Sequence, residues 1–174
     1  MPQRYIDTTL FDLFKVGPGP SSSHTIGPMK AGHHFAETCA ALPRDLLVRA
    51  VRFRVRLYGS LSATGTGHGT DAAVVAGLLG TAPESCPAGL LQELMDDPHT
   101  RRKRSLGDGQ VSVCVDDVSH DAIIHDFSYS NTLVADLLDA EDNVLHSQEY
   151  YSVGGGFIQW KGWEPPSLGK PVHR

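Results

Sequence analysis

The alternation of apolar and charged residues predicts one β-strand clearly. Across residues 50–58 the two kinds take turns, in the order Val51, Arg52, Phe53, Arg54, Val55, Arg56 and Leu57. Successive side chains of a strand point to opposite faces of a sheet. The segment therefore predicts a strand with one buried face.

Three segments have the pattern of helices. Residues 28–41 begin with Pro28, which suits a first-turn position, and carry an apolar face that includes Met29 and Ala36. Leu42-Pro43 ends this helix, because the residue before a proline avoids helical geometry. Residues 71–80, DAAVVAGLLG, predict a short buried helix, and residues 88–95 predict another.

Later segments predict a sheet. Strands are expected at residues 111–115, 122–129, 132–138 and 144–152, and the turn AEDN between the last two favours a hairpin. Residues 17–28, 59–70 and 96–110 predict irregular loops, and the apolar segment 9–16 predicts a helical turn or an extended plug. We expect an α+β fold: a single domain with a few helices packed on a mixed or antiparallel sheet.

Composition and charge narrow the class of protein. The 174 residues include 15 Lys and Arg against 20 Asp and Glu, a net charge of −5, so we expect neither a nucleic-acid nor a membrane surface. The RRKR run at 101–104 has acidic flanks, which favours a solvated loop over a phosphate contact. Three scattered cysteines form no C-x-x-C motif, and the N-terminus has no signal-peptide pattern. A soluble, cytoplasmic protein is expected.

The first candidate site is the run Ser21, Ser22, Ser23, His24 and Thr25, between prolines and before a predicted helix. Hydroxyls and backbone N–H groups at a helix start favour binding of a carboxylate or phosphate. The alternative is a helix N-cap with redundant serines. Four hydroxyls and one imidazole exceed what a cap requires.

The second candidate is the run from Gly65 to Asp71, GTGHGTD. Glycines on both sides of His68 allow a ligand to approach closely, and Asp71 at a helix start can either orient the imidazole or cap the helix. The alternative is a loop histidine with no task. The dinucleotide fingerprint fails because residue 70 is Thr, and the phosphate-binding P-loop fails because no lysine follows the glycines.

The third candidate is the run YYSVGGGF at residues 150–157. Three consecutive glycines lose extra backbone entropy on folding, which is tolerable where backbone must approach a ligand or another chain. A β-bulge or turn is the alternative. The adjacent His33 and His34 lack helical metal-ligand spacing, and we expect them at surface or edge positions.

Three blocks carry a family resemblance: FDLFKVGPGPSSSHTIGPMKAG (11–32), YGSLSATGTGHGTDAAVVAGLLG (58–80) and YYSVGGGFI (150–158). In this order they resemble the N-terminal, or β, domain of the iron–sulfur L-serine dehydratases, also called L-serine deaminases or L-serine ammonia-lyases. They cover about a third of the chain, and residues 81–149 add no recognised motif.

The resemblance implies conversion of L-serine to pyruvate and ammonia. It also implies a [4Fe–4S] cluster, one iron of which acts as a Lewis acid on the departing β-hydroxyl. The competing pyridoxal-phosphate route needs a Schiff-base lysine in a dedicated fold, and the five lysines here lie in no such motif. In this family the cluster cysteines belong to a second, α domain, and three isolated cysteines cannot hold a cluster as a group.

We therefore expect this chain alone to bind no cofactor and to need an α domain, in cis or as a separate subunit. Residues 1–162 are assigned to the β domain and residues 163–174 to a proline-rich linker or tail. A fragment, the β chain of a two-subunit enzyme and a truncated gene product all fit. Homodimerisation is an open possibility.

The site residues divide by their chemistry. His68 is the expected base or proton shuttle, oriented by Asp71. Ser22, Ser23, His24 and Thr25 are expected to grip the serine carboxylate or to close over the cluster. Backbone at Gly154, Gly155 and Gly156 is expected to approach the same site.

Two rival functions remain. One is a non-catalytic regulatory module that binds serine, since the family relates its β domain to such modules. The other is a phosphate-binding domain that uses residues 65–70, against which the missing lysine counts.

Overall fold

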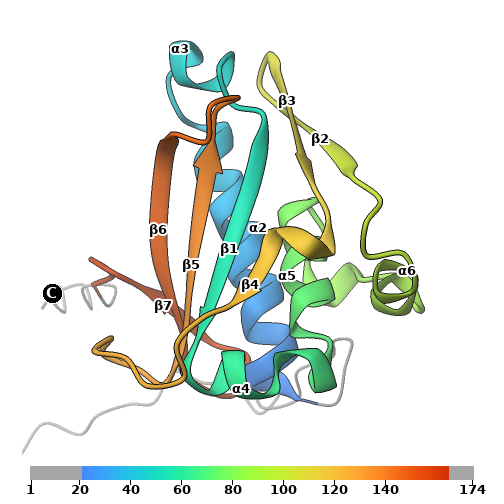
Figure 1. The fold of residues 1–174 in the computed structure, drawn as a ribbon, viewed down its shortest axis with the longest axis vertical. Coiled ribbons are helices and arrows are strands. Elements are labelled where there is room, and N and C mark those ends of the chain that lie inside the picture. Colours follow the sequence, from blue (N-terminus) through green and yellow to red (C-terminus); the bar gives the residue numbers. More distant parts are fainter. Residues whose placement is uncertain (1–20, 165–174) are drawn as a thin grey trace, which may run out of the picture.

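The computed structural model of the protein describes residues 21–164, without the side chains of residues 65–68 (Figure 1). The predictions for residues 9–16, for residues 17–20 and for the tail beyond residue 164 lie outside the described residues. The helical elements are the π-helical turn η1 (Ser22–Ile26), α2 (Gly27–Ala40), α3 (Arg44–Leu47), α4 (Gly59–His68), α5 (Thr70–Leu78), η2 (Pro83–Ser85), α6 (Leu90–Asp96) and η3 (Val115–Asp117). The strands are β1 (Arg52–Tyr58), β2 (Arg102–Leu106), β3 (Gly109–Val113), β4 (Val118–His120), β5 (Asn131–Leu138), β6 (Val144–Ser152) and β7 (Ile158–Trp160).

One mixed sheet organises the described residues. Its seven strands run in the order β2-β3-β1-β5-β6-β7, and β4 also pairs with β1. Strands β3 and β4 run parallel to β1 and take successive stretches of one of its edges, whereas β5 pairs antiparallel along the other edge. Strands β5 and β6 form the predicted hairpin. The expected α+β class is thus confirmed.

The core lies between one face of the sheet and the helices. Phe53, Val55 and Leu57 of β1 pair with the helix-facing residues of β5 and are fully buried. Helix α2 packs Phe35 and Cys39 into the same cluster. Figure 1 shows α2 and α5 side by side along the sheet. Every residue of α5 that the structure describes, apart from Asp71, is buried, as its apolar sequence predicts.

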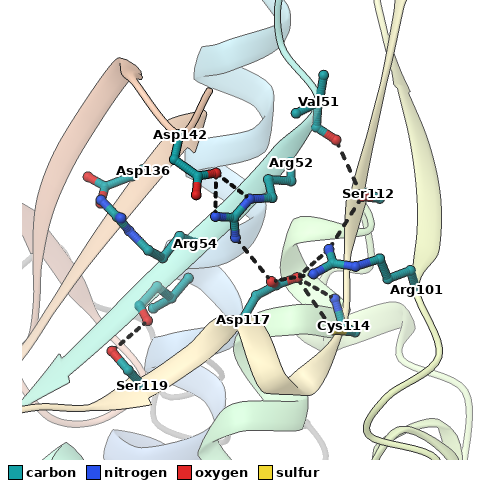
Figure 2. Close-up of polar contacts among 11 residues, drawn as sticks. Val51, Arg52, Arg54, Arg101, Ser112, Cys114, Asp117, Ser119, Asp136 and Asp142 are labelled. Carbon is teal, nitrogen blue, oxygen red and sulfur yellow. Dashed lines mark hydrogen bonds and ion pairs between the residues drawn. The ribbon is translucent and has the colours of Figure 1, made fainter. Parts of the chain in front are cut away.

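The opposite face of β1 carries its arginines. Arg54 and Arg56 both donate to Asp136 of β5, whose side chain is only 1% exposed. Arg52 lies between Asp117 and Asp142 (Figure 2). The charged face is therefore neutralised by carboxylates rather than left to solvent alone.

Two predicted loops are helical. Residues 59–70 form α4 and the start of α5, because tertiary contacts supply what the Gly-, Ser- and Thr-rich sequence lacks. The N–H groups of Gly59 and Ser60 donate to the carbonyls of Ala122 and Ser130, and Leu61 is fully buried. The described part of residues 17–28 likewise forms η1 and the start of α2, with Pro28 in the first turn as predicted.

Two further predictions were wrong. The charged segment 96–110 contains β2 and the start of β3, because its arginines find partners: Arg101 pairs with Asp117, Arg102 with Glu93, and Arg104 with Glu37. Residues 122–129 form no strand, and the short β4 precedes them. No helix in the described range combines the length and apolarity needed to cross a membrane.

Candidate active site

All three candidate runs reach the same end of the sheet. Strand β1 ends at Tyr58, which pairs with Thr132 near the start of β5, and β6 places Tyr151 on the far side of Thr132. The antiparallel order thus brings the start of α4 and the glycine run after β6 to one edge, together with η1 and the start of α2 (Figure 1). Direct hydrogen bonds join the three runs.

A change of helical pitch in η1 makes these bonds possible. The N–H of Gly27 donates to the carbonyl of Ser22, five residues back, instead of to that of Ser23. Pro28 has no N–H, so it cannot pair with the carbonyl of His24 as an α-helical residue would. The carbonyls of Ser23 and His24, in the run Ser21–Thr25 (the serine run), therefore lack their usual α-helical partners.

Hydroxyls from the other two runs donate hydrogen bonds to these carbonyls. Thr70 Oγ1 donates to the His24 carbonyl at 2.6 Å, and Ser152 Oγ donates to the Ser23 carbonyl at 2.7 Å. Thr70 is fully buried and Ser152 nearly so. A Cβ at Gly27 would lie 2.2 Å from Ser152 Oγ, so this approach requires glycine.

Hydroxyls also hold the imidazole of His24. Its Nε2 lies 3.0 Å from Ser60 Oγ and 3.3 Å from the Ser60 carbonyl, and its Nδ1 lies 2.9 Å from Ser23 Oγ. A carbonyl only accepts, so the arrangement favours the tautomer in which Nε2 donates and Nδ1 accepts from Ser23. The serine run is thus an ordered network, with Ser22 half-buried and Thr25 fully buried beside it.

The glycine run after β6 forms a tight turn. Gly154, Gly155 and Gly156 all have positive φ, at 94°, 57° and 73°, and the Phe157 N–H donates to the Gly154 carbonyl. Only glycine adopts three such conformations in succession without strain. The turn begins two residues after Ser152, whose hydroxyl bonds to the Ser23 carbonyl, so it lies close to the serine run.

The second run contributes a carboxylate with an unexpected partner. Asp71 lies in the first turn of α5, and His120 Nε2 lies 3.1 Å from both of its oxygens, with hydrogen-bond geometry to Oδ2. His120 Nδ1 lies 3.1 Å from the carbonyl of Ser62 in α4. His68 ends α4, three residues before Asp71, but its side chain is outside the described part, so its pairing with Asp71 stays a prediction.

The pKa of His120 is raised by its partner Asp71. Partial burial opposes a charged imidazole, but the hydrogen bond and negative charge of Asp71 outweigh it and raise the pKa of His120 above its usual value. The protonated ring donates from both nitrogens, which matches its two acceptors.

The described residues do not fit the ligand set of an iron–sulfur cluster. No group of three or more His, Cys, Asp or Glu among them is arranged to hold a metal ion. Cys39, Cys86 and Cys114 are unpaired and lie in separate elements. Burial raises the pKa of all three thiols, that of Cys39 to about 12, which disfavours the thiolate that a metal requires.

Sequence reasoning found the runs but missed several partners. Ser60, Thr70 and Ser152 lie within or beside the candidate runs, yet nothing in their local pattern shows that they hold the serine run. His120 lacked any motif. The signal that would have found it is the alternation of Val118, Ser119 and His120, which places His120 on the helix-facing side once β4 is recognised as a strand.

Comparison with known proteins places this chain in a family. The model of the serine dehydratase beta chain matches residues 9–163. L-serine dehydratase 2 of Escherichia coli K12 is 40% identical over 156 residues, which cover 86% of this chain and 33% of that protein. The L-serine dehydratases of Streptomyces coelicolor and Haemophilus influenzae are 39% and 37% identical, each over 86% of this chain and 33% of the relative.

The chain thus spans about a third of the length of these relatives. The match extends across all three candidate runs. It also includes residues 81–149, where no motif had been recognised. The chain belongs to the serine dehydratase beta chain family.

Proposed function

We propose that this chain is the β portion of an L-serine dehydratase, which converts L-serine to pyruvate and ammonia. The observation that carries the proposal is the convergence of the three runs through Thr70, Ser152 and the released carbonyls of Ser23 and His24. This network gathers hydroxyls and an imidazole from three segments distant in sequence at one place. The names of the relatives supply the substrate class.

The serine run and the glycine turn are proposed to bind the amino acid. Ser22, Ser23, His24 and Thr25 offer hydroxyl, imidazole and backbone donors that suit a carboxylate. The turn at Gly154, Gly155 and Gly156 leaves backbone accessible beside them, since two of its residues are not fully buried. Binding here would orient the α-carbon toward the end of α4.

His68 is proposed as the base that takes the α-proton, with Asp71 as its orienting carboxylate. The pairing with His120 leaves room for this, because Asp71 Oδ1 accepts no hydrogen bond from the described residues. A neutral imidazole titrates in the range that suits proton transfer near neutral pH.

The [4Fe–4S] cluster is proposed to be held by an α domain, in cis or as a separate subunit. The described part of this chain does not fit as its ligand set, so no step is assigned to the cluster here. This division accounts for relatives about three times longer than the matched region.

The first experiment compares the chain alone with the complete protein. The chain should bind no cluster after anaerobic reconstitution and make no pyruvate from L-serine. Joined to, or co-expressed with, its α domain, it should do both. A brown, active isolated chain would refute the division of roles.

The second experiment replaces His68 by Ala in the complete protein. Turnover should fall by about 10²–10⁴-fold with the cluster spectrum intact, because a positioned base is lost. His99→Ala is the matched control, since His99 pairs with Asp116 at the surface. A raised KM with unchanged kcat would instead assign His68 to substrate binding.

A regulatory serine-binding module is the outcome that would replace this proposal. It requires serine to bind away from Ser23 and His68 and to alter activity without being consumed there. Chemical-shift mapping with L-serine on the complete protein distinguishes the two functions.

A further inference from the structure

We propose that His120 is a positioning residue of the proposed active site, tying α4, which ends at His68, to the first turn of α5, which carries Asp71. The inference rests on the proposed function for its catalytic consequence, whereas the positioning itself is testable without turnover. His120 would touch neither substrate nor cofactor and would act through the two helices.

The register of the sheet aims His120 at this junction. Parallel pairing places Val118 opposite Val55 and His120 opposite Leu57, so both point to the helix-facing side. Ser119, between them, hydrogen-bonds to Asp121 at the surface. The imidazole at the last position of β4 therefore faces the helices at the rim of the core, with 27% of its side chain exposed.

The two ring nitrogens contact different helices. Nδ1 reaches the Ser62 carbonyl in α4, and Nε2 reaches Asp71 in α5. Between Ser62 and Asp71 the chain passes through Gly69, whose φ of 68° separates α4 from α5. The His120 side chain spans this break, so it determines how α4, held at Ser62, lies relative to Asp71.

Among the described side chains, the other hydrogen bonds from α4 to neighbouring segments also lie in its first half. Gly59, Ser60 and Ser62 bond to the loop that follows β4. Ser60 also holds His24. Among contacts of the described side chains, the His120 bridge is the one that links α4 directly to Asp71, next to His68.

Charge strengthens the bridge. The carboxylates that face His120 are Asp71 from α5 and the adjacent Asp121, and α4 presents the Ser62 carbonyl. The pKa of His120 is raised by Asp71 in spite of partial burial. The bridge is therefore strongest below that pKa and weakens as the pH rises through it.

The test compares His120→Ala and His120→Gln with the matched control His99→Gln. Gln extends an amide toward Asp71 and retains a neutral hydrogen bond, whereas Ala retains none. His99 forms a similar imidazole–carboxylate pair with Asp116, but at the surface and away from the helices. All three are made in this chain and in the complete protein.

Amide hydrogen exchange on the chain tests the positioning directly. His120→Ala should accelerate exchange at the end of α4 and at Gly69 by about 3- to 10-fold, the range expected for losing one or two hydrogen bonds. Helix α2 should be unaffected, His120→Gln should restore most of the protection, and His99→Gln should change nothing there. Unchanged exchange at the α4–α5 junction in His120→Ala would overturn the inference.

Kinetics of the complete protein test the consequence. His120→Ala should lower kcat by about 10–100-fold with little change in KM, because misplacing a reacting group by an ångström is costly. His120→Gln should recover most of this loss. A kcat equal to that of His99→Gln would overturn the inference.

The proposed function can fail separately. A complete wild-type protein that does not consume L-serine would refute that function, while the exchange comparison would still decide whether His120 holds the junction.

Discussion

At the scale of single residues, carboxylates pair with the arginines on the outer face of β1. Asp136 is almost completely buried, yet it receives Arg54, Arg56 and Ser147 at once. Asp142 contacts Arg52 but remains 62% exposed. The same ion-pair chemistry thus occurs in two solvent environments on one face. Figure 2 shows both carboxylates beside β1. The two carboxylates should differ widely in their effect on stability.

Asp136→Ala should lower the free energy of unfolding by about 2–4 kcal/mol. Two guanidinium groups would lose their shared partner, although their 34% exposure makes the cost smaller than for a fully buried pair. Asp142→Ala, the matched control, should cost no more than about 1 kcal/mol. Urea unfolding of both variants measures the difference. Equal losses would show that burial of Asp136 is energetically unimportant.

His34 should make the folded state less stable as the pH falls. Its ring stacks on Trp160 and accepts the hydroxyl of Tyr150 at Nδ1, so it packs into the helix–sheet interface rather than lying free at the surface. Burial, with the neighbouring His33 as a second cause, lowers the pKa of His34 below 6.5. A proton then binds the unfolded chain more readily than the folded one.

The stability that neutral His34 contributes is complete above about pH 6.5 and is lost as the pH falls through the interval down to its lowered pKa. The advantage of wild type over His34→Gln should therefore shrink between pH 7.5 and pH 5.5. His99→Gln should show the opposite trend, since the hydrogen bond and charge of Asp116 raise the pKa of His99. Urea titrations at three pH values measure both trends, and a constant difference for His34 would contradict the prediction.

At the scale of elements, strongly patterned segments were predictable and weakly patterned ones were not. The arginine alternation fixed β1, and the apolar run of α5 predicted a buried helix. Helix α4 was not predicted because its glycines, serines and threonines have poor helix propensity. It forms because carbonyls from the loop after β4 accept hydrogen bonds from its first N–H groups, a contact that local sequence does not show. The three site runs were identifiable from composition, but Asp71–His120 depends on a strand register that local sequence does not reveal.

The crossing of α2 and α5 depends on two glycines. A Cβ at Gly77 would lie 2.1 Å from the Met29 carbonyl, and one at Gly32 would lie 2.4 Å from the Val74 carbonyl. Backbone cannot yield as a flexible side chain does, so the helices touch only because both Cβ atoms are absent.

Gly77→Ala should destabilise the fold by at least about 2 kcal/mol, although alanine alone would favour a helix by about 1 kcal/mol. Gly89→Ala is the comparison. Its Cβ would meet nothing within 4 Å, so only its φ of 86° is penalised, at about 1 kcal/mol. Thermal or urea unfolding decides. A stabilised Gly77→Ala variant would mean that the two helices can separate without loss.

At the scale of the whole molecule, the first strand of the sheet depends on partners made later in the sequence. Strand β1 takes partners from β3, β4 and β5, all of which come later in sequence. Leu133, Ala135 and Leu137 of β5 complete the core around it. The described elements before β5 therefore leave one edge of β1 without a neighbouring strand.

A chain ending at residue 130 should therefore fail to unfold cooperatively. It lacks β5, β6 and β7, and with them one neighbour of β1 and a large part of the core. A chain ending at residue 164 retains every described element and should give a single sharp transition. Circular dichroism melts and amide dispersion in NMR spectra distinguish these outcomes. A cooperative melt of the shorter chain would show that α2, α5 and β1 form a stable unit.

The late arrival of β5 has a consequence during synthesis on the ribosome. Helices α2 and α5 and strand β1 emerge first, and the apolar face of β1 must wait through residues 59–130 before its antiparallel neighbour begins to be made. An unpaired central strand is a template for association between nascent chains. The arginines at alternate positions of β1 repel copies of themselves until Asp136 arrives with β5. Arg54 and Arg56, which bind Asp136 in the finished sheet, thus oppose association between nascent chains until Asp136 is made.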